Sequence, residues 1–140
     1  MLKRFSWWEL ALVAVGVLLL PNTAHAWGPA AHLFWGMHAL GEAAILAPFV
    51  RRLLQAFPDD FLYGNIAADV IVGKNLAPSY DLHAHNWKNG FRVLDEAKSE
   101  RQQAFALGYL AHLASDTIAH NYFVPYKLVE SYEAASLRHL

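Results

Sequence analysis

Two histidines and an aspartate recur at intervals of four residues in the C-terminal third of the sequence. His112, Asp116 and His120 form the pattern H-x-x-x-D-x-x-x-H inside an otherwise apolar stretch. Four residues advance an α-helix by about 400°, so the three side chains lie along one stripe of a helix. Two imidazoles and a carboxylate on an apolar face are costly unless something satisfies them. A metal ion does so, and the pattern therefore indicates a metal-binding helix.

The helix that carries this pattern is predicted between Ser99 and Pro125. Ser99 and Gln102 match a capping box, which would begin the helix. Pro125 is expected to end it, because proline interrupts the hydrogen bonding of a helix interior.

A third carboxylate, Asp69, stands in a setting that also favours a ligand. It lies in the apolar run IAADVIV, with no basic neighbour in the sequence to pair with. Such a carboxylate is a candidate metal ligand or a member of a buried ion pair. Asp59 and Asp60 follow Pro58, and we expect one of them to be the N-cap of the helix that carries Asp69.

Four further histidines are less informative by position. His32 and His38 lie about 240° apart on a helix predicted after Gly28-Pro29, so they cannot serve one site together. His38 is interpreted as a surface or core-edge residue. His83 and His85 are expected on a helix over residues 82–98, where positions i and i+2 point in different directions. At most one of these two easily joins a given metal.

The composition predicts an all-α, single-domain protein that is mostly buried. The chain has 140 residues, of which 56% are hydrophobic and 16% charged, and it shows no β-type alternation. Its formal net charge of −1 offers no basic surface for nucleic acid. The absence of cysteine excludes disulfides, thiolate zinc sites and thiol nucleophiles. No obligate protein partner is evident.

Residues 1–26 read as a secretory signal peptide. Lys3 and Arg4 precede an apolar run from Leu10 to Leu20, and Ala24-His25-Ala26 matches an A-x-A cleavage site. An uncleaved membrane anchor is the alternative, but the apolar run is shorter than the ~20 residues that a span needs. We therefore expect an exported protein, periplasmic or secreted, whose helical domain covers residues 27–140.

Four segments of the mature chain carry a resemblance to a known family. They are WGPAAH, YGNIAADVIVGK, HAHNW and GYLAHLASDTIAHNYF. The chain from Trp27 to Leu140 resembles the zinc-dependent phospholipase C family and, more distantly, the fungal single-strand nucleases that share its fold. The resemblance implies a helical protein that binds up to three Zn²⁺ ions.

The resemblance implies most of the ligands of two of the three zinc sites. Trp27 would bind one zinc through its free α-amine and carbonyl oxygen, with His32 beside it. Asp69 and His112 would hold a second zinc together with a histidine of the HAH segment. Asp116 would bridge the two ions.

Two ligand assignments stay open within the resemblance. The spacing favours His83 as the histidine that joins the second zinc, whereas the H-N-W context favours His85, to which we lean. His120 and His139 would belong to the remaining zinc. The family's last site usually ends in H-x-x-x-E or H-x-x-x-D, but this sequence ends at Leu140. We therefore expect a C-terminally truncated piece of a longer protein or, alternatively, a third zinc that is weak or absent.

The activity that the resemblance implies is hydrolysis of the head-group phosphodiester of a phospholipid by metal-activated water. Asp69 would act as the general base, and contact with a membrane surface would be transient. A single-strand nuclease that uses the same zinc ions is one alternative, with Trp35 or Tyr63 available to stack on bases. A non-catalytic zinc-binding domain is another.

Overall fold

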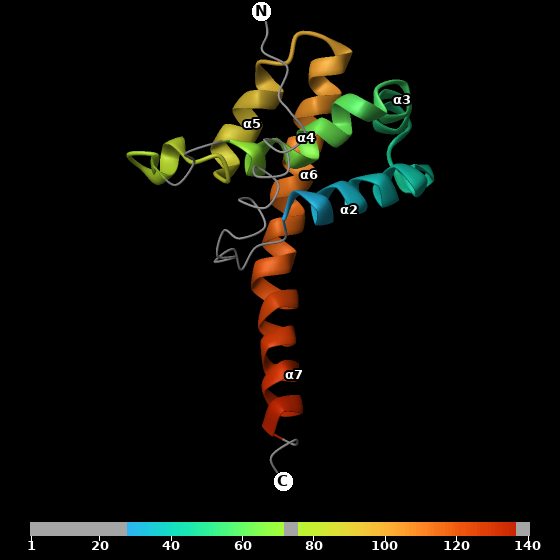
Figure 1. Ribbon diagram of the computed structural model, residues 1–140. Coiled ribbons are helices and arrows are strands. Elements are labelled where there is room, and N and C mark those ends of the chain that lie inside the picture. Colours follow the sequence, from blue (N-terminus) through green and yellow to red (C-terminus); the bar gives the residue numbers. More distant parts are fainter. Residues whose placement is uncertain (1–27, 72–75, 137–140) are drawn as a thin grey trace, which may run out of the picture.

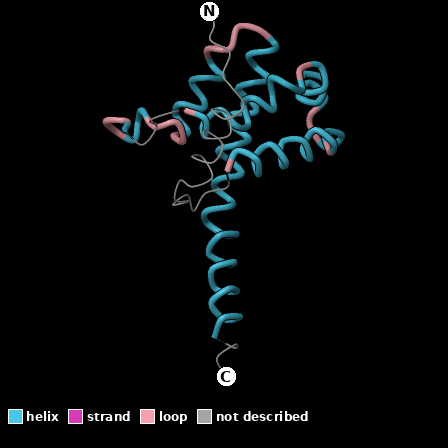
Figure 2. Tube along the Cα trace, in the orientation of Figure 1, coloured by secondary structure: helices cyan, strands magenta, loops and turns pink. Residues whose placement is uncertain are grey.

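The described part of the protein, residues 28–71 and 76–136 of a computed structural model, consists of helices joined by loops and turns and contains no strand (Figures 1 and 2). Its helices are α2 (Pro29–Gly41), α3 (Pro48–Ala56), α4 (Pro58–Val70), α5 (Trp87–Asp95), α6 (Glu100–Ile118) and α7 (Val124–Ser136). Short 3-10 turns cover Ala43–Ile45 and Tyr80–Leu82. The all-α prediction is confirmed. The predicted signal peptide, Trp27 and His139 lie outside the described residues.

Prolines begin three of the helices, because a proline at the first helical position loses no hydrogen bond. Pro29, Pro48 and Pro58 occupy this position in α2, α3 and α4. The prediction that Asp59 or Asp60 caps α4 is wrong. Phe57 is the N-cap, and both aspartates lie in the first turn, where a negative charge interacts favourably with the helix dipole.

Helices α4 and α6 form the centre of the fold by crossing at two glycines. A Cβ atom added to Gly64 of α4 would collide with the carbonyl oxygen of Phe105, and one added to Gly108 of α6 would collide with that of Phe61. The close approach brings the backbone of α4 beside the face of α6 that carries His112. The core combines buried alanines with larger side chains in two clusters: Ala67, Ala68, Ala84, Tyr109 and Leu113, and Leu53, Leu54, Phe61 and Ala104.

Helix α6 begins as predicted and continues further than predicted. Ser99 and Gln102 form the capping box. Pro125 does not end the helix, since a π-helical segment, Ala119–Phe123, joins α6 directly to α7 and the two form one long rod (Figure 1). In this segment the Val124 N–H donates to the Ala119 carbonyl, five residues back. The wider turn ahead of Pro125 accommodates a residue that would otherwise disrupt the helix.

The HAH segment does not lie on a helix, which corrects the predicted helix over residues 82–98. His83 and His85 occupy a turn between the 3-10 turn at Tyr80–Leu82 and α5. Asn86 is the N-cap of α5, and its side chain accepts a hydrogen bond from the Lys88 N–H at 2.8 Å. In this turn the two rings remain neighbours, with their centroids 5.4 Å apart.

Many large apolar side chains are exposed, although the composition predicted a mostly buried protein. On α2, Phe34 is 62% exposed and Met37 59%, and on α7 Tyr126 is 64% exposed and Leu128 60%. Figure 1 shows α7 extending away from the other helices. Within residues 28–71 and 76–136, no helix combines the length and apolar character that crossing a membrane requires.

Candidate metal centre

Five potential ligands converge where α2, α4 and the turn before α5 meet α6. His32 comes from α2, Asp69 from the end of α4, His85 from the turn, and His112 and Asp116 from α6. His32 and His112 are completely buried. Ionisable groups are rarely buried together unless they are paired or bind a metal.

Asp116 lies between the imidazoles. Its Oδ1 is 3.1 Å from His32 Nε2, and its Oδ2 is 3.3 Å from His85 Nε2 and 3.6 Å from His112 Nε2. Burial pushes the pKa of Asp116 up, but the neighbouring imidazoles of His32, His112 and His85 outweigh this and hold the pKa below its ordinary value. Asp116 is therefore an anionic carboxylate with each oxygen directed at a different ring.

Asp69 approaches two of the same rings from α4. Its Oδ1 lies 3.3 Å from His85 Nε2, and its Oδ2 lies 3.8 Å from His32 Nε2. The side chain is only 7% exposed. The candidate that the sequence singled out by its apolar surroundings is thus brought to within ion-pair distance of two histidines.

His112 is held in one tautomer by the backbone of α4. Its Nδ1 lies 2.8 Å from the Asn65 carbonyl oxygen, which can only accept, so Nδ1 carries the proton. Burial, followed by the charge of His32, lowers the pKa of His112 and favours the neutral ring. Its Nε2 then presents a lone pair to the centre, 3.1 Å from His85 Nε2. A carbonyl partner of this kind is typical of metal-binding histidines.

The donor set fits zinc. Two groups of ligand atoms each lie within 4.8 Å of one another: His32, His112 and Asp116, and Asp69, His85 and His112. Imidazole nitrogens and carboxylate oxygens without thiolates are typical of catalytic zinc sites. Lone pairs facing one another at about 3 Å repel, so the space between these groups requires a proton or a metal cation.

The remaining predicted ligands lie at the edge of the centre or beyond the described residues. His120 is 43% exposed and its Nε2 is 3.9 Å from Asp116 Oδ1. His83 belongs to neither group; its Nδ1 accepts the backbone N–H of His85 at 3.1 Å, and its ring stacks on Tyr80. Of the two alternatives in the HAH segment, the structure brings His85 to the centre. Ligand roles for these residues stay predictions.

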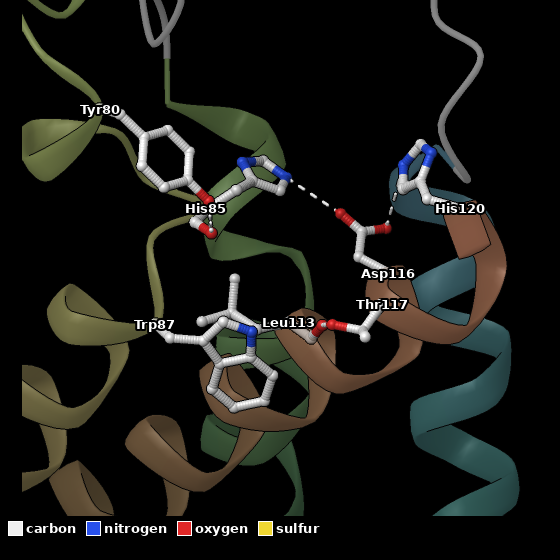
Figure 3. Close-up of a pocket in the computed structure, with 7 residues that line it drawn as sticks. All are labelled: Tyr80, His85, Trp87, Leu113, Asp116, Thr117 and His120. Atoms are coloured by element: carbon white, nitrogen blue, oxygen red, sulfur yellow. Dashed lines mark hydrogen bonds and ion pairs between the residues drawn. The ribbon is translucent and has the colours of Figure 1, made fainter.

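An open cavity lies against the centre (Figure 3). Its volume is about 340 Å³, and His85, Asp116 and His120 form one side of it. Tyr80 and Trp87 contribute aromatic surface, and Leu113 and Thr117 complete the lining. The polar side chains of the centre and the aromatic rings thus border the same cavity.

Several residues around the centre were not found from the sequence. Asn65 contributes through its carbonyl, and a backbone group carries no signal in the residue type. Ser115 bonds to His32, and Tyr80 and Trp87 line the cavity. Ser115 stands next to Asp116, which is the only hint that the sequence offered.

Comparison with known proteins agrees with this donor set. The family model described as zinc dependent phospholipase C matches residues 30–140, which include every described residue of the centre. A search of curated proteins and a search of solved structures each found no match to the chain. The chain belongs to the zinc-dependent phospholipase C family.

Proposed function

We propose that the protein is an exported zinc-dependent phosphodiester hydrolase of phospholipase C type that acts on the head group of a phospholipid. The observation that carries the proposal is the convergence of His32, His85, His112, Asp69 and Asp116 beside an open cavity, in a chain of this family. Export rests on the signal-like character of residues 1–26.

Zinc would be held by two overlapping groups that share His112. The first contains His32 and Asp116, and the second contains Asp69 and His85. Asp116 lies near imidazoles of both groups, which supports a bridging position. A third ion would need His120 and His139.

The reaction would be a direct displacement at phosphorus. When bound, zinc would supply a Lewis acid that lowers the pKa of water and offsets the charge on the phosphoryl oxygens. Asp69 would accept the proton of the attacking water. The new bond joins the water oxygen to phosphorus, the bond from phosphorus to the glycerol oxygen breaks, and the glycerol oxygen takes up a proton.

The chain's own residues would orient the substrate. Tyr80 and Trp87 offer aromatic faces at the cavity, and His120 lies at its rim beside Asp116. Trp35 and Tyr63, the aromatic residues considered for base stacking, do not line this cavity. These two residues therefore give the nuclease alternative no support at this cavity.

The test combines metal analysis with two substrates. Purified protein is analysed for zinc, then assayed on a chromogenic phosphorylcholine ester and on single-stranded DNA, with and without a zinc chelator. We expect zinc in the folded protein, hydrolysis of the ester that stops on chelation and returns with zinc, and no DNA cleavage. DNA cleavage alone would replace the lipid substrate with nucleic acid. Folded protein that binds no zinc would contradict the proposal.

A further inference from the structure

Ser115 links the buried ring of His32 to the helix that carries His112 and Asp116. The Ser115 Oγ lies 3.1 Å from His32 Nδ1, and its hydroxyl donates to the His112 carbonyl oxygen at 2.9 Å. The two residues of the first contact are 83 positions apart in the sequence. One side chain therefore joins α2 to α6 at the centre.

The direction of these hydrogen bonds follows from counting protons. A serine hydroxyl has one proton, and the His112 carbonyl can only accept. Once the hydroxyl donates to that carbonyl, its oxygen must accept from His32 Nδ1–H. His32 therefore carries a proton on Nδ1, and Nε2 is the nitrogen that is available to a cation beside Asp116, 3.1 Å away.

Ser115 contacts the Nδ1 edge of the His32 ring, whereas Nε2 on the opposite edge faces Asp116 at 3.1 Å and Asp69 at 3.8 Å. The ring is completely buried and stacks on His112, with the ring centroids 3.8 Å apart. Stacking sets the plane of the ring, but it does not distinguish one nitrogen from the other. The Ser115 hydroxyl makes this distinction, as the Asn65 carbonyl does for His112.

We propose that Ser115 is a positioning residue that fixes the tautomer and the rotation of His32 and thereby raises the affinity of the centre for zinc. The inference rests on the proposed metal centre and concerns a residue that would not itself touch the ion. Hydrogen-bond partners of metal-binding histidines contribute about 10- to 100-fold to metal affinity.

The test compares three variants in zinc affinity, measured by competition with a chromogenic chelator. We expect Ser115→Ala to bind zinc about 10- to 100-fold more weakly than the wild type. Ser115→Thr should stay close to the wild type, because a helical threonine hydroxyl also bonds to the carbonyl of the preceding turn. Ser131→Ala is the matched control, since Ser131 donates to the Leu128 carbonyl at 2.9 Å on the exposed face of α7.

A second measurement separates positioning from a general loss of structure. Imidazole ¹⁵N chemical shifts of the labelled protein report which nitrogen of His32 is protonated. We expect Ser115→Ala to change these shifts while the circular dichroism spectrum stays that of a folded helical protein. Ser115→Thr should restore them.

The outcomes distinguish this inference from the proposed function. A wild-type chain that binds no zinc overturns both. A wild type that binds zinc, with Ser115→Ala equal to it in affinity and in ¹⁵N shifts, overturns the role of Ser115 alone. A Ser115→Thr variant as weak as Ser115→Ala also contradicts that role, because the hydroxyl would then not be the group that matters.

Discussion

Asp116 is the carboxylate that lies closest to the imidazoles of the centre. Its two oxygens face His32 and His85 separately, and its carboxylate is held in the charged form despite its burial. Removing that charge without changing the shape of the side chain tests whether Asp116 and the surrounding imidazoles bind a cation. Asparagine is the appropriate replacement, because it keeps the volume and places an amide where an anion stood.

We expect Asp116→Asn to lose zinc and turnover. The change removes a direct candidate ligand, so the fall in zinc affinity should exceed the about 10- to 100-fold effect typical of an outer-shell change. Zinc content after purification and the rate of phosphorylcholine ester hydrolysis measure the effect. Asp95→Asn, at the exposed end of α5, is the control. Zinc and turnover retained in Asp116→Asn would remove the bridging role.

The HAH segment permits a direct comparison of two histidines. We expect His85→Ala to lower zinc affinity at least as much as an outer-shell change does, about 10- to 100-fold, because its Nε2 faces both Asp69 and Asp116. His83→Ala should have a smaller effect, since His83 contacts the backbone N–H of His85. Competition with a chelator measures the zinc affinity of both variants, and His38→Ala, at an exposed residue of α2, is the control. A larger loss for His83→Ala would reverse the assignment.

At the scale of elements, the crossing of α4 and α6 sets the distance between Asp69 and the stripe of α6. We expect Gly108→Ala to destabilise the protein by about 3 kcal/mol, because the added methyl group meets the Phe61 carbonyl, and backbone yields less easily than a side chain. Urea unfolding of the metal-free protein measures this change. Gly41→Ala, with nothing within 4 Å of an added Cβ, should change stability by less than about 0.5 kcal/mol. Equal midpoints for the two variants would contradict the close packing.

The turn that carries His85 is attached to α6 by Tyr109. The buried hydroxyl of Tyr109 donates to the Ala84 carbonyl, one residue before His85. We expect Tyr109→Phe to lose about 1 kcal/mol of stability at neutral pH, because that carbonyl is left without this donor. Urea unfolding measures the loss, and Tyr132→Phe, at a side chain 78% exposed on α7, is the control.

The same hydroxyl predicts a pH dependence at the alkaline end. Burial raises the pKa of Tyr109 above its ordinary 10.0, so the folded state holds the proton more tightly than the unfolded chain. The stability that this provides is complete below pH 10 and falls as the pH rises toward the raised pKa. Tyr109→Phe should show a shallower alkaline loss than the wild type. Parallel curves for the two proteins would show that Tyr109 does not contribute to it.

At the scale of the whole molecule, the centre joins segments that are distant in sequence. Helices α2, α4 and α6 and the turn before α5 each supply at least one of its residues. No cysteine is present to crosslink them. Because a ligand that binds only the folded state stabilises it by mass action, zinc should contribute substantially to stability.

We expect removal of zinc to lower the thermal midpoint. At free zinc 1,000 times the dissociation constant, binding adds about 4 kcal/mol, and all of this is lost with excess chelator. Thermal unfolding followed by circular dichroism, with and without chelator and after zinc is restored, measures the change. Asp116→Asn should be insensitive to chelator. A midpoint that is independent of zinc in the wild type would contradict a coupling between the metal and the fold.

The sequence alone determined the features that depend on residues within a few positions of one another. The capping box at Ser99, the helix that follows Gly28-Pro29 and the shared stripe of His112 and Asp116 all follow from helical periodicity and local hydrogen bonding. Its apolar surroundings singled out Asp69, and the family resemblance added ligand roles for His32 and the HAH segment, where both His83 and His85 stayed open with a lean to His85.

Only the tertiary structure decided how these candidates meet. It brought His85 rather than His83 to the centre, joined α6 to α7 through a π-helical segment at Pro125, and revealed the contacts of Ser115 and of the Asn65 carbonyl. These outcomes depend on the packing of α2 and α4 against α6, across separations of 47 and 83 residues. Periodicity describes the faces of one helix, whereas the partner of each face is set by close packing between helices.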